Sequence, residues 1–464
     1  MQIIITQDSV KELLHKKITR FFQNIEVHAD ITDKRLIRIE VKINKINLVQ
    51  WLLKQQHAVK TYWRDRQHKF EMAGVGEADT VAGNVETGNY GNIFSRLKQY
   101  LTRKYPRLRY YGGIQFQHSD KKEEHWLKFG SYRFVVPLFE VYSDRKATYF
   151  ACNFMFNPSE NHQTQLDRII RQLHAIEWDD QAFENEQPEL LSRKDFPDKT
   201  GWAKNITTAL RSFEKTNLGK IVLARKSEFE FAEPLDGMQT LRRLQEVDPT
   251  AFYFCFQTFK NQAFIGATPE RLYRREFRDL MSEAVAGTRP RSRNAEADER
   301  LELELLNSDK DLREHQFVVD SLRESFADLC ANIVDPHKIF VLKLSRLQHL
   351  YAKIRGTLHP FISDSEILHM LHPTPAVGGY PRDLALPKIS ELEPFDRGWY
   401  AGPIGWFSKN AAEFAVAIRS GMVYHNKLLL YAGAGIVPGS EPEKEWDELE
   451  NKISNFMRAL NIEE

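Results

Sequence analysis

Hydrophobic residues follow two different spacings along this chain, and the two kinds of segment do not alternate regularly. Apolar positions three and four residues apart predict helices, whereas alternation of apolar and polar positions predicts strands. The mixture favours an α+β architecture over a doubly wound parallel sheet. The helical spacing covers 10–25, 202–215, 297–307, 309–330 and 441–460. The strand-like segments are 35–43, 60–72, 111–116, 132–142, 221–231, 252–258, 263–268, 413–424 and 427–434.

A polar, acidic and proline-containing stretch at 180–199 predicts a connecting segment. The segments before it are mostly strands, whereas most predicted helices and all the glycine-rich strings follow it. We therefore expect a strand-rich subregion at 1–199 and a region at 200–464 that carries the candidate chemistry.

Composition narrows the classes of protein to consider. Hydrophobic residues make up 42% of the 464 and charged residues 28%, which is typical of a globular protein with a sizeable core. The net charge of +1 gives no broad attraction to nucleic acid or to an anionic membrane. The N-terminus lacks the features of a signal peptide, and no apolar run is long enough to span a bilayer. The three widely separated cysteines are expected to be reduced and buried, so a cytoplasmic protein is expected.

The last predicted helix brings acidic residues to the edge of the core. Ser440 and Glu443 have the spacing of a capping box, so the helix is expected to begin there. Glu445, Glu448 and Lys452 then share one ridge beside the apolar seam. Two carboxylates beside a core edge favour a bound cation, and Mg²⁺ prefers carboxylate oxygen. The alternative is a solvated acidic first turn that the helix dipole stabilises.

A second acidic pair and three glycine-rich strings complete the candidate chemistry. Asp311 and Glu314 lie three residues apart on another predicted helix. Glycine lets backbone N–H groups approach a ligand closely, so the strings 286–288, 377–379 and 432–435 suggest an anion pocket. Ordinary turns and bulges are the alternative for any single string.

A set of ordered strings resembles the chorismate-utilising enzymes, which include isochorismate synthases, salicylate synthases, anthranilate synthase component I and aminodeoxychorismate synthase component I. The resemblance extends from about Trp202 to the end, and the first part is similar to the N-terminal region of long, menaquinone-pathway isochorismate synthases. It implies one large domain over 1–464 with an anthranilate synthase component I-like fold, in which two large facing β-sheets carry helices outside. The strings lie at 220–225, 266–272, 286–289, 308–315, 372–379, 400–406, 417–420, 432–436 and 440–448.

The resemblance also implies a magnesium site and a chorismate pocket. Glu314 and Glu448 correspond to Mg²⁺ ligands, with Asp311 and Glu445 in the surrounding acidic shell. Further positions correspond to residues that bind the substrate. These are Gly287, Thr288, His349, Ala376, Tyr400, Arg419, Gly433, Gly435, Glu445 and Lys452.

Members of the family differ in the nucleophile that reaches C2 of the ring. Ammonia-using anthranilate enzymes have Gln where this chain has Lys220, and a buried lysine can activate water as a general base. Aminodeoxychorismate synthases have a nucleophilic Lys at the position of Ala286, which disfavours that activity here. Glu270 resembles the acid that protonates the departing C4 hydroxyl. The structural alternatives are a strand-edge surface position for Lys220 and an ion pair between Glu270 and Arg271.

The expected reaction is Mg²⁺-dependent conversion of chorismate to isochorismate, with water addition at C2 and loss of the C4 hydroxyl. Ala376 favours this outcome over that of the pyruvate-eliminating salicylate synthases, which tend to have a bulkier residue there. The long N-terminal region favours a role in menaquinone synthesis, with a catechol siderophore pathway or salicylate synthesis as alternatives. A monomer or homodimer is expected, without a glutamine amidotransferase subunit. A non-catalytic chorismate-binding homologue is disfavoured because every expected polar position is filled.

Overall fold

The structure is a computed structural model of the whole chain, and it describes residues 7–24, 33–84, 90–121, 123–178, 187–247, 250–334, 339–343 and 347–462. Part of the predicted connecting segment at 180–199 therefore lies outside the described residues. Within the described part, β9 (Leu190–Phe196) is a strand that pairs with β10 (Lys220–Phe231). The prediction of a simple connection is wrong there, because these half-buried residues extend a sheet.

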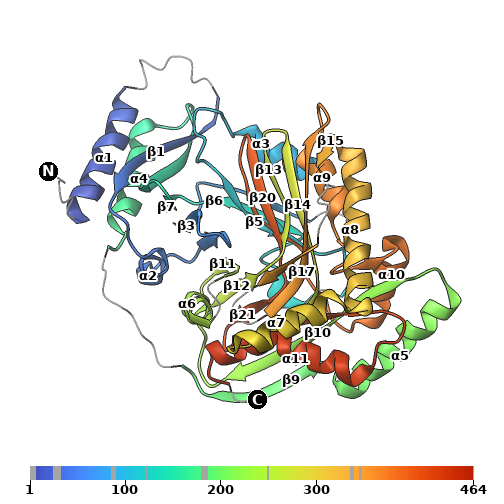
Figure 1. Cartoon of the computed structure of the whole chain (residues 1–464). Coiled ribbons are helices and arrows are strands. Elements are labelled where there is room, and N and C mark those ends of the chain that lie inside the picture. The colour runs from blue at the N-terminus through green and yellow to red at the C-terminus, as the bar shows by residue number, and fades with distance from the viewer. Residues whose placement is uncertain are drawn as a thin grey trace.

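Twelve strands form the larger of two antiparallel sheets, and β9 lies off the main path beside β10 (Figure 1). The other strands, in spatial order, are β1 (Arg35–Ile43), β8 (Thr148–Phe156), β7 (Phe139–Asp144), β3 (Phe70–Val75), β2 (Lys60–Arg64), β11 (Phe252–Phe259), β12 (Gln262–Thr268), β21 (Ser420–Tyr424), β22 (Lys427–Ile436), β10 and β18 (Gly379–Tyr380).

Ten strands form the second antiparallel sheet, in which β16 (Phe340–Lys343) lies off the main path and pairs with β17. The other strands, in spatial order, are β15 (Cys330–Val334), β17 (Leu347–Leu358), β14 (Asp279–Pro290), β13 (Arg271–Glu276), β20 (Ala411–Val416), β19 (Pro403–Phe407), β5 (Tyr110–Ile114), β6 (Tyr132–Val136) and β4 (Asp79–Gly83).

The helices lie around the outside of the two sheets (Figure 1). Helix α8 packs on β14 and β17, α10 packs on β10, and α11 packs on β22. No helix among the described residues is long and apolar enough to cross a membrane. The helices are α1 (Gln7–Gln23), α2 (Leu48–Lys54), α3 (Gly91–Gln99), α4 (His162–His174), α5 (Lys199–Lys215), α6 (Gly237–Val247), α7 (Ala295–Leu306), α8 (Asp309–Leu329), α9 (Asp364–Leu371), α10 (Arg382–Leu392) and α11 (Pro442–Ala459).

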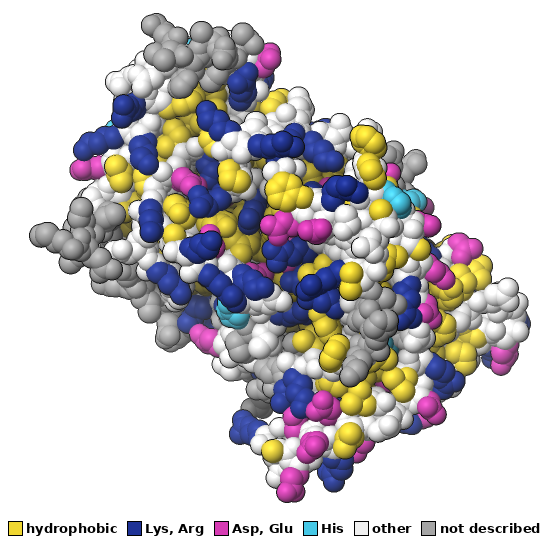
Figure 2. All heavy atoms as spheres, turned by 45° about the horizontal axis from the view of Figure 1, so that its top comes forward, with side chains coloured by type: hydrophobic (Ala, Val, Ile, Leu, Met, Phe, Trp, Pro, Cys, Tyr) yellow, Lys and Arg dark blue, Asp and Glu magenta, His cyan; other side chains and the backbone are white. Residues whose placement is uncertain are grey.

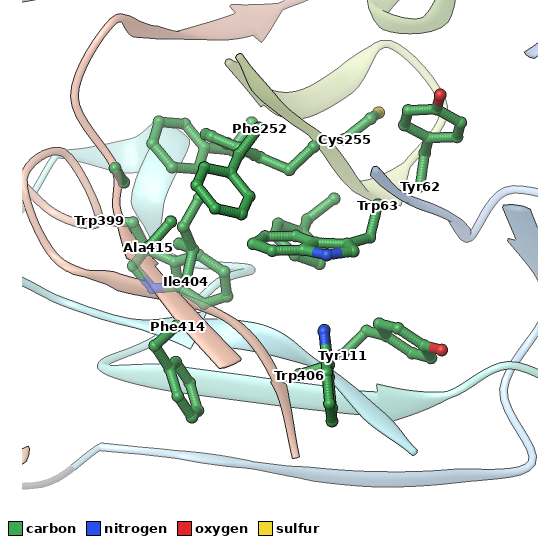
Figure 3. Packing of buried hydrophobic residues seen from close by; sticks show 14 of the residues in the cluster. Tyr62, Trp63, Tyr111, Phe252, Cys255, Trp399, Ile404, Trp406, Phe414 and Ala415 are labelled. Atoms are coloured by element: carbon green, nitrogen blue, oxygen red, sulfur yellow. The ribbon is translucent and has the colours of Figure 1, made fainter. Parts of the chain in front are cut away.

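Apolar side chains fill the space between the two sheets (Figure 3). Trp63 of β2 and Phe252 of β11 belong to the larger sheet, and their ring centroids are 5.8 Å apart. The ring of Phe70 on β3 lies 6.0 Å from Trp406 on β19 and 6.4 Å from Tyr111 on β5, between centroids. Because Phe70 belongs to the larger sheet and its two partners to the smaller, the sheets face each other across one core. The predicted α+β fold with two large facing sheets is confirmed.

Two segments that were predicted as single strands change sheet part-way. The segment 132–142 forms β6 in the smaller sheet and β7 in the larger, with Pro137 between them. The segment 413–424 forms β20 and β21, also in different sheets, and Arg419 lies between them at a φ of 50°. Proline cannot donate a ladder hydrogen bond and a left-handed residue redirects the chain, so each interrupts strand pairing. Because both halves of each segment are buried in the same core, hydrophobic alternation does not reveal the break.

The surface is mixed in charge, in agreement with the near-zero net charge of the sequence. On the face in Figure 2, Lys and Arg side chains are spread over most of the surface, with acidic ones between them and toward the lower edge. The three cysteines are free and buried, as predicted.

Phe414 on β20 tests how much the apolar layer between the smaller sheet and helix α3 contributes to stability. It is fully buried, and the rings of Tyr273, Phe134 and Phe94 lie 5.4, 6.1 and 6.3 Å from it, between centroids. Phe414→Ala should lower the free energy of unfolding by about 3–5 kcal/mol, because it leaves a cavity. Chemical denaturation followed by tryptophan fluorescence measures the change. The control is Phe361→Ala, because the side chain of Phe361 is 100% exposed. In this control the free energy of unfolding should change by less than about 0.5 kcal/mol. Equal losses of stability in the two variants would contradict the prediction.

Candidate active site

A cavity of about 580 Å³ lies where β10 and β22 of the larger sheet approach β14 of the smaller sheet and the first turns of α8 and α11. This volume is typical of pockets that bind small organic molecules. All of the predicted site residues except Lys220 and Glu445 line it. The predicted residues in its wall are Glu270, Gly287, Thr288, Glu314, His349, Ala376, Tyr400, Arg419, Gly433, Gly435, Glu448 and Lys452.

Lys220 lies immediately behind the cavity wall, as the first residue of β10. Its side chain is fully buried, and its Nζ is 2.8 Å from Oε1 of Glu314 on α8. Tyr380 of β18 pairs with Lys220 on one side, while β22 pairs with β10 on the other. The alternative of a strand-edge surface lysine is therefore wrong, because the ammonium group is enclosed between strands and paired with a carboxylate.

Gly435 of β22 leaves the space that this ion pair occupies. A Cβ at Gly435 would lie 2.8 Å from Oε1 of Glu314 and 3.0 Å from Cε of Lys220. Gly433, two residues earlier on the same strand, accepts a hydrogen bond at its carbonyl oxygen from Nζ of Lys452 at 2.8 Å. The glycine-rich string thus allows charged side chains to approach the backbone closely.

Glu270 follows β12 and is buried, with 4% of its surface exposed. Burial raises the pKa of Glu270 to about 8; Lys220 opposes this effect and Glu283 adds to it. The carboxyl group therefore carries a proton at neutral pH, as a general acid requires. Arg271 pairs instead with Glu283 and, through Nε at 3.0 Å, with Glu413, so the alternative ion pair between Glu270 and Arg271 is wrong.

Four acidic side chains from the first two turns of α8 and α11 lie at or beside the cavity. Each is paired with a cation, which offsets the cost of removing its charge from bulk water. The pairs are Asp311 with Arg289 at 2.7 Å, Glu314 with Lys220 at 2.8 Å, Glu445 with Lys310 at 3.4 Å, and Glu448 with Lys452.

The two carboxylates of α11 differ in their electrostatic surroundings. Burial raises the pKa of Glu445, and the neighbouring Glu448 raises it further. Burial alone would also raise the pKa of Glu448, but Lys452 and its hydrogen bond lower it. Glu445 lies behind the cavity wall with 2% exposure, whereas Glu448 lines the cavity.

The start of α11 differs from the predicted capping box. The residue before its first turn is Glu441, whose side chain makes no capping hydrogen bond, and Pro442 begins the helix. The hydroxyl of Ser440 accepts a hydrogen bond from the backbone N–H of Val437 at 3.2 Å, so it is not the helix cap. The capping-box prediction is wrong, although the helix itself is confirmed.

His349 on β17 is held in one tautomer by the glycine-rich string of β14. Its Nδ1 is 3.1 Å from the carbonyl oxygen of Gly287 and 3.1 Å from Oγ1 of Thr288. A carbonyl oxygen can only accept, so Nδ1 carries the proton. Burial, with Arg419 nearby, lowers the pKa of His349 to about 4, so the ring is neutral at pH 7 and Nε2 can accept a hydrogen bond.

Comparison with known proteins identifies the family. A family model described as chorismate binding enzyme matches residues 20–461. The chain belongs to this chorismate-binding enzyme family. It is similar to isochorismate synthase MenF of Bacillus subtilis (strain 168), with 31% identity over 416 residues that cover 87% of this chain and 88% of the relative.

Solved structures support the same fold for this chorismate-binding enzyme. The structure of MenF, the menaquinone-specific isochorismate synthase from Escherichia coli, has a TM-score of 0.81 and 28% identity, covering 96% of this chain and 100% of the other. Anthranilate synthase component I from Streptococcus pneumoniae TIGR4 has a TM-score of 0.67 at 20% identity, covering 91% and 92%. The predicted anthranilate synthase component I-like fold is therefore confirmed.

The carboxylates at the cavity of this chorismate-binding enzyme match part of the coordination that Mg²⁺ prefers. Among the described residues, no group of three His, Cys, Asp or Glu side chains could hold a metal ion. Mg²⁺ commonly keeps several waters and takes only one or two protein carboxylates. Glu314 and Glu448 both line the cavity, and both attract the ammonium group of Lys310, so their negative charge favours a cation on this side of the cavity. These two carboxylates fit an ion that completes its coordination with water and substrate oxygens.

Four charged residues of the cavity wall were not predicted as site residues, namely Arg289, Lys310, Lys444 and Asp447. Arg289 and Lys310 each lie inside a string that carried the family resemblance, and each pairs with an acidic residue of the site. The sequence placed both cations inside these strings, but it gave no sign of their acidic partners, because Lys310 and Glu445 lie on segments that only the fold brings together.

Gly435→Ala tests whether the space beside β22 is needed by the ion pair. The added methyl group should displace Glu314 and Lys220, so we expect kcat with chorismate to fall at least about tenfold while the fold is retained. Steady-state kinetics and circular dichroism measure the two effects. The control is Gly91→Ala, where the nearest atom to a new Cβ is Oγ of Ser365 at 3.9 Å, and it should leave kcat unchanged. Wild-type kcat in Gly435→Ala would contradict the assignment.

Proposed function

We propose that this chorismate-binding enzyme converts chorismate into isochorismate, and that it does so for menaquinone synthesis. The observation that carries the proposal is the placement of a buried lysine, Lys220, and a protonated carboxyl, Glu270, at one cavity. A hydroxyl exchange needs both a base for the entering water and an acid for the departing hydroxyl. The names of the relatives, which include a menaquinone-specific enzyme, support the same reaction and pathway.

The residues would divide the reaction between them. Lys220, once it has released its own proton and become an uncharged amine, would take a proton from the water that forms a bond to C2 of the ring. The ring double bonds shift, and the bond between C4 and its hydroxyl breaks as Glu270 donates a proton, so that water leaves. One water is consumed and one is released, and the proton that Lys220 gained is returned through solvent to Glu270, so the net change is an isomerisation.

Charged groups around the cavity would hold the substrate during this exchange. Arg419 and Lys452 line the cavity and provide cations for the carboxylates of chorismate. Glu314 and Glu448 would hold Mg²⁺, which when bound anchors the ring carboxylate and tempers its charge. The neutral His349 and the hydroxyl of Tyr400 provide hydrogen-bonding groups in the same wall.

Two side chains favour this reaction over those of other family branches. Ala286 on β14 lines the cavity and has no amine that could attack the ring. Ala376 also lines the cavity and leaves room where the resemblance expects a bulkier residue in pyruvate-eliminating enzymes. We further propose that the enzyme acts in the cytoplasm, as a monomer or homodimer and without an amidotransferase subunit.

The direct experiment is incubation of the purified protein with chorismate and Mg²⁺, followed by chromatographic separation of the products. Isochorismate should be the main product, and chelation of the metal with EDTA should abolish its formation. Lys220→Ala should lower kcat by about 10²–10⁴, because the general base is lost. Salicylate with pyruvate as main products would assign a salicylate synthase, and anthranilate formed only with ammonium would assign the amidating branch.

Glu270 should give the reaction an alkaline limit. Because burial raises its pKa to about 8, the acid form that the reaction needs is lost as the pH rises through that value. We expect kcat/KM to fall by about tenfold for each pH unit above the limit, in assays from pH 6 to 10 with thermal melts as a control for folding. Glu270→Gln should lower kcat by about 10²–10⁴ and remove the alkaline limb from the residual rate. An undiminished rate at pH 10 would contradict the assignment.

A further inference from the structure

Lys310 occupies a position in which a helix disfavours positive charge. It is the second residue of α8, where the helix dipole presents its positive end. Its Nζ lies 3.4 Å from Oε1 of Glu445, a buried carboxylate in the first turn of α11. Burial alone would lower the pKa of Lys310, but Glu445, Glu448 and Glu314 together raise it. The acidic residues of two helices therefore hold this ammonium group in place against the dipole.

Lys310 differs from the other cations that pair with the acidic side chains. The side chain of Lys220 is 0% exposed, that of Lys452 is 22% exposed and also donates to a strand carbonyl, and that of Arg289 is 30% exposed. The side chain of Lys310 is 53% exposed, and its contact is longer than the 2.7 and 2.8 Å contacts of Arg289 and Lys220. Lys310 can therefore turn into solvent by giving up one long contact, to Glu445.

We propose that Lys310 is a removable counter-ion for the metal site. Its ammonium group neutralises the carboxylates of α11 and α8 when no divalent cation is bound, and it turns into solvent when a cation takes its place. The inference rests on the proposed function, in which Glu314 and Glu448 hold Mg²⁺. Because the ammonium group and the metal are attracted by the same negative charge and repel each other, the binding of one opposes the binding of the other. Lys310 therefore weakens the affinity of the free enzyme for Mg²⁺.

The test is the affinity of the chorismate-free protein for Mg²⁺, measured by isothermal titration calorimetry. Lys310→Met keeps the apolar stem and removes the charge, and it should bind Mg²⁺ roughly three- to tenfold more tightly than the wild type. Thermal melts provide a second readout. In EDTA the variant should melt at a lower temperature than the wild type, because Glu445 has lost its partner, and added Mg²⁺ should raise its melting temperature more.

The matched control is Lys444→Met. Lys444 also lines the cavity, but its Nζ pairs with Glu441 at 2.6 Å on the exposed start of α11. Its removal should leave the Mg²⁺ affinity within about twofold of the wild type, because no buried carboxylate loses its counter-ion. An equal gain of affinity in Lys444→Met would overturn the inference, since the effect would then come from general positive charge at the cavity.

Other outcomes separate this inference from the proposed function. If the wild type binds Mg²⁺ and Lys310→Met binds it equally or more weakly, the counter-ion role is wrong and the proposed function stands. If the wild type binds neither Mg²⁺ in calorimetry nor Mn²⁺ in electron paramagnetic resonance, the metal site fails and the counter-ion role fails with it. Lys310→Gln, which keeps a polar group, is the second variant and should show the same direction of change if the inference is correct.

Discussion

The active cavity depends on one ion pair, between the buried Lys220 on the larger sheet and the partly buried Glu314 on the helix that covers the smaller sheet. The charge of Lys220 could not remain there alone, because an isolated ion loses several kcal/mol of hydration when it is removed from water. The pair also requires Gly435, whose absent side chain leaves room for both groups. A lysine, a glutamate and a glycine from three separate segments therefore have to be present together.

This ion pair lies where the two sheets and two helices meet, which explains how residues distant in the sequence reach one cavity. Strands β10 and β22 bring Lys220 and Gly433, β14 brings the 286–289 string, and α8 and α11 bring the carboxylates. The acid, Glu270, follows β12 near the core, where burial keeps it protonated. The same cavity therefore holds a proton on one carboxyl group and negative charge on another, because burial dominates at Glu270 whereas Lys452 stabilises the charge of Glu448.

The sequence predicted the local elements and most of the site, but it did not predict how the elements were combined. The strand at 35–43 and the helix at 202–215 were visible because their apolar positions keep one period throughout. The change of sheet at Pro137 and Arg419 was not visible, since the residues on both sides are buried in the same core. The ion-pair partners were the second feature that the sequence did not predict. Motif spacing placed Glu448 and Lys452 together, whereas pairs such as Lys310 with Glu445 join segments whose proximity only the fold creates.

The mixed origin of the strands in each sheet has a consequence for synthesis on the ribosome. Strand β2 pairs with β11, and β5 pairs with β19, so the edges of both early strands stay open until partners from the far part of the chain emerge. Exposed edges and apolar faces of this kind favour wrong association and slow folding, because the productive contacts are so distant in sequence. The two sheets can therefore be completed only after residue 407 of β19 has left the exit tunnel, and until then the nascent chain exposes the edges of strands that are already synthesised.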